Sequence, residues 1–314
     1  MNEKSVKLKG TVFALIGGAC WGFSGTCGQF LFSIKSINTE WLTAVRMLSA
    51  GIIMVIMALF TQRDNIKGIL SSKIDRLALL VFGIMGLMLC QYTYFAAIAN
   101  SNAATATVLQ YLGPALIMVY VCLRSLRLPN IKEITAIILA VTGTFLLATH
   151  GNISSLTISP AGLSFGLLSA VTLAVYTLMP GKLIARWGSL TVTGLGMLVA
   201  GVAFTLFSRA WTIHQNIDIQ SAFIVILIIM IGTVLPFTLY LKGVSYIGAS
   251  KASVFACIEP VSATFFSAVW LKSKFTPMDL LGFSFIIATV LMLSLKDFSS
   301  EKLLKRKQIS KILN

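Results

Sequence analysis

The sequence predicts an all-α integral membrane protein, with ten transmembrane helices arranged as two inverted five-helix repeats. Three observations predict this class. The 314 residues are 57% hydrophobic and only 11% charged. Apolar runs of about 20 residues, the length of a helix that crosses a hydrocarbon core, recur along the chain. The segment Tyr94–Pro114 is repeated without a gap, 146 residues later, by Tyr240–Pro260.

The ten apolar runs are the predicted transmembrane elements. The strands of a membrane barrel would alternate in polarity, whereas these runs are continuously apolar, so each is predicted to be a helix. The predicted spans cover residues 9–31, 38–60, 76–98, 102–123, 131–149, 160–180, 190–210, 220–241, 250–271 and 277–296. The longest polar connections are Gln62–Asp75, Thr149–Pro160 and Ser208–Gln220.

The connection Thr149–Pro160 divides the chain into two predicted domains of five spans each. The first repeat is 9–149, the second is 160–296, and a basic cytoplasmic tail, 297–314, follows. Because an odd number of spans separates equivalent points, the second repeat must be inverted in the membrane. The identical pairs are Tyr94/Tyr240, Ala103/Ala249, Ala106/Ala252, Val108/Val254 and Pro114/Pro260. Inverted repeats with broken helices near the middle of the membrane are typical of secondary transporters.

The placement of the basic residues favours a lipid bilayer as partner, although a net charge of +15 would also suit nucleic acid. With the N-terminus inside, 20 of the 25 Lys and Arg residues fall on the inner side and 4 on the outer side. Arg46 alone lies away from the ends of a predicted span. The positive-inside rule therefore predicts a multi-pass protein of the plasma (inner) membrane with both termini cytoplasmic. The basic tail is interpreted as an anchor to anionic lipid, and no nucleic-acid partner is expected.

Several kinds of chemistry are disfavoured by the motifs. All five cysteines lie in apolar runs and form no CxxC pair, so neither a disulfide framework nor a zinc site is predicted. His150 and His214 fall in separate connections, where we expect solvated side chains. The sequence has no phosphate-binding loop and no Gly-x-Ser-x-Gly motif. We therefore expect no metal, no cofactor and no enzymatic activity.

Glu259 is the acidic residue near the middle of a predicted span. A carboxylate there costs on the order of 2–3 kcal/mol on insertion scales, so it is expected to face a cavity or a partner. Loss of hydration disfavours the charged form, which makes Glu259 a candidate to bind and release a proton. Pro260 has no N–H and frees the carbonyl of Ala256. A free carbonyl beside a carboxyl suits a proton, a cation or a substrate amine. A structural hydrogen bond to a neighbouring helix is the alternative.

Pro114 predicts the same break in the fourth span, where it frees the carbonyl of Gln110. Gly113 stands there in place of the glutamate. The two broken helices are expected to meet as the halves pack. A kink that only shapes the bundle is the alternative interpretation.

Arg46 lies about two turns into the second predicted span. Its side chain has three possible arrangements, which the sequence leaves open. It can extend outward to the membrane interface, pair with Glu259, or bind a substrate carboxylate through two parallel hydrogen bonds.

Polar and aromatic residues recur on one face of several predicted spans. Ser169, Thr172 and Tyr176 show the spacing i, i+3, i+7, and Thr233, Pro236 and Tyr240 repeat it. Such a stripe is expected to face the interior rather than lipid. The predicted cavity residues are Trp21, Gln91, Tyr94, Gln110, Tyr176 and Tyr240. Packing between helices without contact to a substrate is the alternative.

Four segments resemble a known family. They are ACWGFSG (19–25), TAVRMLSAG (43–51), NAATATVLQYLGP (102–114) and KASVFACIEP (251–260). In these segments the chain resembles the EamA-type transporters of the drug/metabolite transporter superfamily. The resemblance implies a ten-helix basket of inverted repeats, with a central cavity lined mainly by helices 1, 3, 4, 6, 8 and 9. It also implies family-pattern positions at Trp21, Arg46, Gln110, Pro114, Glu259 and Pro260. The chain departs from the family where many members close helices 4 and 9 with a glutamate, because CLRSLR and WLKSKF stand there.

Family members include exporters of amino acids and related metabolites. The expected function is therefore secondary active export of small polar metabolites such as amino acids, by alternating access, with protons as a candidate coupling ion. An uncoupled facilitator of small metabolites is the first alternative, and a non-transport membrane scaffold or receptor is the second. The sequence leaves the oligomeric state open, and a monomer is compatible with it.

Overall fold

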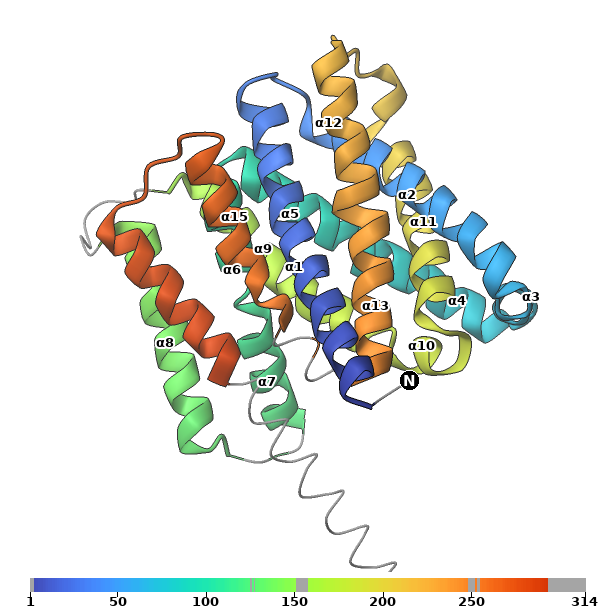
Figure 1. Cartoon of the computed structure of the whole chain (residues 1–314), viewed down its shortest axis with the longest axis horizontal. Helices are drawn as coiled ribbons and strands as arrows, with labels where there is room; N and C mark the ends of the chain where they lie inside the picture. Colours follow the sequence, from blue (N-terminus) through green and yellow to red (C-terminus); the bar gives the residue numbers. More distant parts are fainter. Residues whose placement is uncertain are drawn as a thin grey trace, which may run out of the picture.

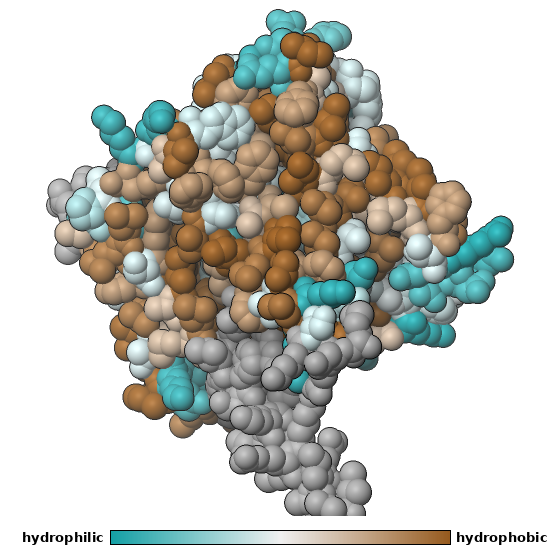
Figure 2. All heavy atoms as spheres, in the orientation of Figure 1, coloured by the Kyte–Doolittle hydropathy of each residue, from teal (hydrophilic) through white to brown (hydrophobic). Residues whose placement is uncertain are grey.

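The computed structural model describes residues 3–124, 126, 128–150, 158–247, 252 and 255–292, and all the regular structure in these ranges is helical. Within this part of the chain, seven helices are long and apolar enough to cross a membrane. Apolar residues dominate the middle of the face in Figure 2, and hydrophilic residues gather at its upper tip and right-hand margin. The chain is therefore an all-α, multi-pass membrane protein. The predicted basic tail, 297–314, lies outside the described residues.

The described helices follow the predicted order of spans (Figure 1). The seven candidate spans are α1 (Glu3–Ser33), α2 (Thr39–Thr61), α4–η1–α5 (Lys73–Val81, Phe82–Met88, Leu89–Ala99), α6–α7 (Ala103–Gln110, Gly113–Arg124), α9 (Pro160–Leu178), α11 (Ser189–Ser208) and α12–η3–α13 (Ile219–Ile229, Met230–Val234, Leu235–Ile247). Further apolar helices lie at the three other predicted spans: α8 (Ile131–Thr149), α15 (Ile258–Val269) and a terminal helix (Pro277–Met292). Residues 250, 251, 253 and 254 of the ninth predicted span are not among the described ones.

Two short helices lie in connections where no helix was predicted. These are α3 (Arg63–Ser71) and α10 (Gly181–Trp187). They meet at one end of the bundle, where a Cβ on Gly68 of α3 would lie 2.0 Å from the Trp187 ring of α10. Beside this contact, Asp75 of α4 accepts hydrogen bonds from Arg186 Nη1 and Trp187 Nε1, each 3.0 Å long. Each is too short and too polar to stand out from a run of connecting residues. Their contact joins the α2–α4 connection to the α9–α11 connection.

The opposite end of the bundle has a matching contact between connections. Lys35, after α1, forms an ion pair with Asp218, the residue that caps the N-terminus of α12. The Lys35 ammonium lowers the pKa of Asp218 well below its usual range, and the backbone N–H of Ser221 adds to the effect. Asp218 is exposed, so solvent screening keeps the contribution of this pair to stability small.

Two spans contain a π-helical segment at the same relative position. The segment η1 joins α4 to α5, and η3 joins α12 to α13. They end at Met88 and Val234, which are 146 residues apart, the spacing that also relates Pro114 to Pro260. π-helical segments are rare and often occur at functional sites. Neither segment was predicted, because the pattern of hydrophobic residues does not distinguish a single π-helical turn from an α-helical one.

Helices α2 and α11 pack through reciprocal glycines. A Cβ on Gly51 would lie 2.5 Å from the backbone nitrogen of Leu198, and a Cβ on Gly201 would lie 2.6 Å from that of Leu48. Both distances are below van der Waals contact, so only glycine allows the two backbones to approach this closely. Each residue of α2 in this contact has its counterpart 150 residues later in α11. The contact is therefore two-fold related.

Helix α8 and the terminal helix lie side by side (Figure 1) and begin with the same kind of cap. Asn130 and Glu133 exchange side-chain and backbone hydrogen bonds of 2.7 and 3.0 Å. Thr276 and Asp279, 146 residues later, do the same at 2.8 and 3.2 Å. Such capping boxes satisfy two of the otherwise unpaired N–H groups at a helix start.

The expectation of solvated loop histidines holds for His214, which is exposed, and only in part for His150. Its Nε2 lies 2.9 Å from Asp279 Oδ1, and its side chain is 31% exposed. The residue follows α8 in the left-handed conformation, with φ of 50°, and its side chain reaches the start of the terminal helix. A loop histidine can therefore join two helix ends that the sequence does not show to be adjacent.

Candidate functional site

The two broken helices meet at Glu259. This residue lies in the first turn of α15 and is only 9% exposed. Tyr111, at the break between α6 and α7, places its hydroxyl 3.0 Å from Glu259 Oε2 and 3.1 Å from the carbonyl oxygen of Ala256. The phenol thus donates to one of two acceptors within a single turn. The juxtaposition agrees with the expectation that the two breaks meet.

The prolines determine where these helices begin. Pro114 is the second residue of α7 and Pro260 the third residue of α15. Proline is tolerated in a first turn, because the N–H that it lacks would have no intrahelical partner there. The Ala256 carbonyl, which Pro260 cannot satisfy, accepts from Tyr111 instead. The helix break at Pro260 therefore leaves the Ala256 carbonyl free to accept a hydrogen bond, as the sequence predicts.

Helix α1 packs closely behind Glu259. A Cβ on Gly22 would lie 2.4 Å from the Glu259 carbonyl oxygen and 2.0 Å from Ser262 Oγ. Ser262 donates its hydroxyl hydrogen towards the carbonyls of Ala19, at 3.2 Å, and Glu259, at 3.0 Å. The backbone around Glu259 is thus fixed by contact with α1, while the carboxyl group is directed to Tyr111.

We expect Tyr111→Phe to lower the stability of the purified protein by about 1 kcal/mol, because hydrogen bonds between membrane helices contribute about 0.6 and at most about 1.7 kcal/mol. Thermal unfolding in detergent measures this. Tyr120→Phe is the matched control, since among the described residues the hydrogen-bond partner of the Tyr120 hydroxyl is the exposed Arg124. Equal unfolding temperatures for the two variants would contradict an energetically important Tyr111 hydroxyl.

Arg46 is buried and directed into the bundle. Its Nε donates to Thr233 Oγ1 at 2.9 Å, its Nη2 donates to the Gly232 carbonyl at 3.4 Å, and the Phe95 ring lies 4.5 Å from the guanidinium carbon. Thr233 and Gly232 belong to η3, so the arginine is held by the π-helical segment. The side chain is only 4% exposed and does not extend to the membrane interface.

Arg46 and Glu259 do not form an ion pair with each other. The arginine contacts η3, whereas the glutamate contacts Tyr111. Two of the three arrangements considered for Arg46, extension outward and pairing with Glu259, are thus absent from this structure. The third arrangement, a carboxylate ligand, is compatible with it.

Of the predicted cavity residues, Trp21 and Tyr240 contact each other, and Tyr94 joins two neighbouring helices. The Trp21 ring is 5.4 Å from the Tyr240 ring and 5.3 Å from that of Phe237. Tyr94 is buried and its hydroxyl lies 2.7 Å from Thr107 Oγ1. The Trp21–Tyr240 pair connects α1 to α13, and Tyr94 connects α5 to α6.

The other three predicted cavity residues have separate partners. Gln110 Nε2 lies 3.8 Å from Cys90 Sγ, and Gln91 Nε2 lies 4.0 Å from Met197 Sδ. The Tyr176 ring stacks on Phe82 of η1, with ring centroids 5.8 Å apart. Sulfur is a weak acceptor, so the two amides keep hydrogen-bonding capacity for another ligand.

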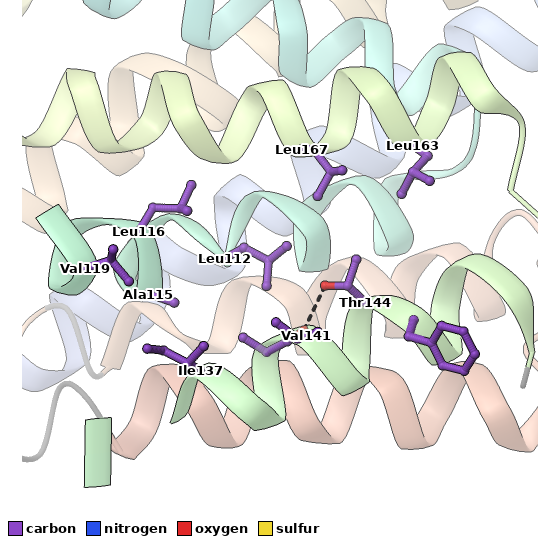
Figure 3. Close-up of a pocket in the computed structure, with 11 residues that line it drawn as sticks. Leu112, Ala115, Leu116, Val119, Ile137, Val141, Thr144, Leu163 and Leu167 are labelled. Carbon is purple, nitrogen blue, oxygen red and sulfur yellow. Dashed lines mark hydrogen bonds between the residues drawn. The ribbon is translucent and has the colours of Figure 1, made fainter. Parts of the chain in front are cut away.

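An apolar cavity of about 400 Å³ lies between α7, α8 and α9 (Figure 3). Leu116, Val141 and Leu167 line it, and the hydroxyl of its polar member, Thr144, donates to Ala140 of its own helix. The lining therefore has no polar group available to orient a polar molecule. Leu116, Val141 and Leu167 also lie on the exposed apolar surface, so the lining of this cavity does not match the polar substrate predicted from the sequence.

Sequence reasoning did not identify Tyr111 as a site residue. In the repeat alignment it faces Cys257, so no identity marks it. The available signal was its position three residues before Pro114, on the face where the helix breaks. Among the described residues, no group of three His, Cys, Asp or Glu side chains is arranged to hold a metal ion.

Comparison with known proteins identifies the family. The EamA-like transporter family model matches residues 8–149 and again 160–295. The uncharacterized inner membrane transporter YicL of Salmonella typhimurium is 40% identical over 287 residues, which cover 91% of this chain and 95% of that protein. The uncharacterized transporter YcbK of Bacillus subtilis is 22% identical over 281 residues, which cover 87% of this chain and 88% of that protein.

A solved crystal structure of a protein has the same fold. It aligns with a TM-score of 0.63 at 16% identity, over 94% of this chain and 98% of the other. These comparisons, together with the apolar helices, show that the chain is a multi-pass membrane transporter of small molecules. This chain belongs to the EamA-like transporter family, within the drug/metabolite transporter superfamily.

Proposed function

We propose that this transporter exports small polar metabolites, such as amino acids, by proton-coupled alternating access. The observation that carries the proposal is the buried Glu259 carboxyl at the meeting point of two broken helices. A carboxyl that exchanges a proton for a substrate amine there would link the two fluxes, because one group cannot hold both at once. Tyr111 would orient the carboxylate in the deprotonated state.

The proposed framework is ten transmembrane helices in two inverted repeats, 9–149 and 160–296. Three findings support it. The family model matches the chain twice, at 8–149 and 160–295. The prolines, π-helical segments and capping boxes recur at one spacing. Helices α2 and α11 contact each other reciprocally. Rocking of one half against the other would expose Glu259 to each side in turn.

The proposed location is the plasma (inner) membrane, with both termini in the cytoplasm. The excess of lysine and arginine in the connections assigned to the inner side supports this orientation. The relative in Salmonella typhimurium is named an inner membrane transporter, which supports the location. In this orientation the pair of Lys35 and Asp218 lies outside, and the contact of Asp75 with Arg186 and Trp187 lies inside.

The proposed cavity is lined by Trp21, Gln91, Tyr94, Gln110, Tyr176 and Tyr240, with Glu259 and Arg46 as its charged groups. Aromatic rings supply flat apolar contact, and the amides of Gln91 and Gln110 supply directional hydrogen bonds. Their contacts to α1, α5, α6, α9 and α13 support an arrangement in which both halves contribute to one site.

Transport in proteoliposomes tests the function. Vesicles that contain the purified protein and a pH-sensitive dye are given a proton gradient and then single amino acids. We expect a substrate to collapse the gradient faster than in protein-free vesicles. Labelled substrate should also accumulate against its own gradient.

Two outcomes would contradict parts of this proposal. Exchange of labelled for unlabelled substrate without proton movement would establish an uncoupled facilitator. No movement of any amino acid, by protein whose thermal unfolding shows it to be folded, would reject this substrate class. Direction is measured separately: cells that overproduce the protein should release labelled amino acid faster than cells with an empty vector.

A further inference from the structure

A second polar cluster lies where α1, α2 and η3 meet. It consists of Ser24, Arg46, Gly232 and Thr233, and is called the Ser24–Arg46 cluster. Ser24 is 2% exposed. A Cβ on Gly232 would lie 2.1 Å from Ser24 Oγ, and the carbonyl of the same glycine accepts from Arg46 Nη2. Two polar side chains from different spans therefore converge on one residue of the π-helical segment.

Some polar atoms of this cluster already have hydrogen-bond partners within the protein. Thr233 Oγ1 accepts from Arg46 Nε and donates to the Ile228 carbonyl, five residues earlier, at 3.0 Å. The Phe95 ring lies against the guanidinium. Three contacts thus hold the arginine in one orientation, with the Nε and Nη2 groups occupied. A rigidly held fork is the arrangement that arginine needs for directional recognition.

Two polar atoms of the cluster remain unpartnered. Ser24 Oγ and Arg46 Nη1 are buried and make no hydrogen bond to any described residue. Buried polar groups are nearly always hydrogen-bonded, and a charged donor left unpaired is the most costly exception. Ionisable groups inside a membrane protein usually mark a substrate or ion pathway. The pair therefore requires a partner that accepts hydrogen bonds.

We propose that the Ser24–Arg46 cluster binds a carboxylate group of the transported molecule. The Arg46 Nη1 group donates to one carboxylate oxygen and the Ser24 hydroxyl donates to the other. A guanidinium beside a hydroxyl favours an anion and repels an amine or a metal cation. The inference rests on the proposed function and narrows its substrates to molecules that carry a carboxylate.

The position of α1 relates this cluster to Glu259. Gly22 of α1 contacts the Glu259 backbone, and Ser24, two residues later, contacts Gly232. Residues two positions apart lie on opposite sides of a helix, so α1 runs between the Ser24–Arg46 cluster and the Glu259 backbone. The carboxylate of the transported molecule is therefore assigned to the cluster alone.

Binding of matched ligands to purified protein tests the proposal. The probes are phenylalanine, leucine and lysine, each compared with its carboxamide and its decarboxylated amine. Propionate and propionamide form a further pair that lacks the amine. Thermal stabilisation in detergent gives the affinity. We expect each acid to bind at least about tenfold more tightly than its amide, since the amide removes a charged acceptor.

Ser24→Ala is the decisive variant, because it removes one hydroxyl and leaves the arginine contacts intact. We expect the preference for acid over amide to fall about tenfold, as for the loss of one hydrogen bond to a charged group. Ser221→Ala is the matched control, since Ser221 is also fully buried but lies in the first turn of α12. Arg46→Lys keeps the charge but loses the fork, and should weaken acid binding further.

The possible outcomes separate this inference from the proposed function. Amides and amines that bind as tightly as acids would overturn the carboxylate site and leave amino-acid-like transport in place. Binding of propionate that depends on Ser24, without binding of any amino acid, would keep the carboxylate site and reject the amino acids. An acid preference that Ser24→Ala leaves unchanged, or no binding by any probe, would overturn the carboxylate site.

Discussion

Replacing Glu259 by glutamine is expected to abolish proton-coupled transport while leaving a folded, membrane-inserted protein. The amide has nearly the same shape as the carboxyl, and its oxygen still accepts the Tyr111 hydroxyl. It cannot bind and release a proton. The change thus removes the ionisable group and keeps the packing. Substrate-dependent proton movement should therefore fall to the rate seen in protein-free vesicles.

Proton movement and substrate exchange distinguish two roles for Glu259. Loss of proton movement with retained exchange would make it a proton site, and loss of both would make it a site for the substrate amine. Glu133→Gln is the matched control. Glu133 is also a buried carboxyl, but it belongs to the capping box of α8, where glutamine serves equally. Unchanged coupling in Glu259→Gln would remove this residue from the mechanism.

Substitution of Gly51 by valine should have the largest effect on stability. Its first added carbon would lie 2.5 Å from the Leu198 nitrogen, which belongs to backbone and cannot rotate away. Helices α2 and α11 must therefore separate. Overpacking in cores costs typically 1–3 kcal/mol, and contact with backbone places this variant at about 3 kcal/mol or more. Thermal unfolding in detergent and the yield of monodisperse protein measure the effect.

Two variants control for the properties of glycine itself. Gly181→Ala at the start of α10 meets no atom within 4 Å and should be neutral or slightly stabilising. Gly201→Val should be as damaging as Gly51→Val, because the α2–α11 contact is reciprocal. Normal stability of Gly51→Val would mean that the two helices are not in close backbone contact in the membrane.

Much of the helical order followed from composition and periodicity. Long apolar runs are strong signals, because the hydrocarbon core fixes both helix length and polarity. The π-helical segments η1 and η3 were missed, since one wider turn changes neither property. The short helices α3 and α10 were missed because they lie outside the apolar runs. Helix pairing across the halves was indicated only where residues repeat, as at Pro114 and Pro260.

The site was predicted in part. Glu259 and Arg46 stood out because charged residues are rare in spans, and both are buried in the structure. Their partners could not be derived. Tyr111 and Thr233 become relevant only when α6 is placed beside α15 and α2 beside η3, and a single sequence does not specify which helix faces which. The roles of these residues in binding remain predictions.

The spacing of shared features bears on the order in which they arose. The broken helices, the π-helical segments and the capping boxes occur in both halves. Three residues of the candidate site occur in one half only: Gly113 stands opposite Glu259, Cys257 opposite Tyr111, and Gly196 opposite Arg46. If the halves descend from one ancestral gene by duplication, the irregular backbone was present before they diverged. The residues found in one half were gained there or lost from the other, so the charged groups mark where the two halves have come to differ.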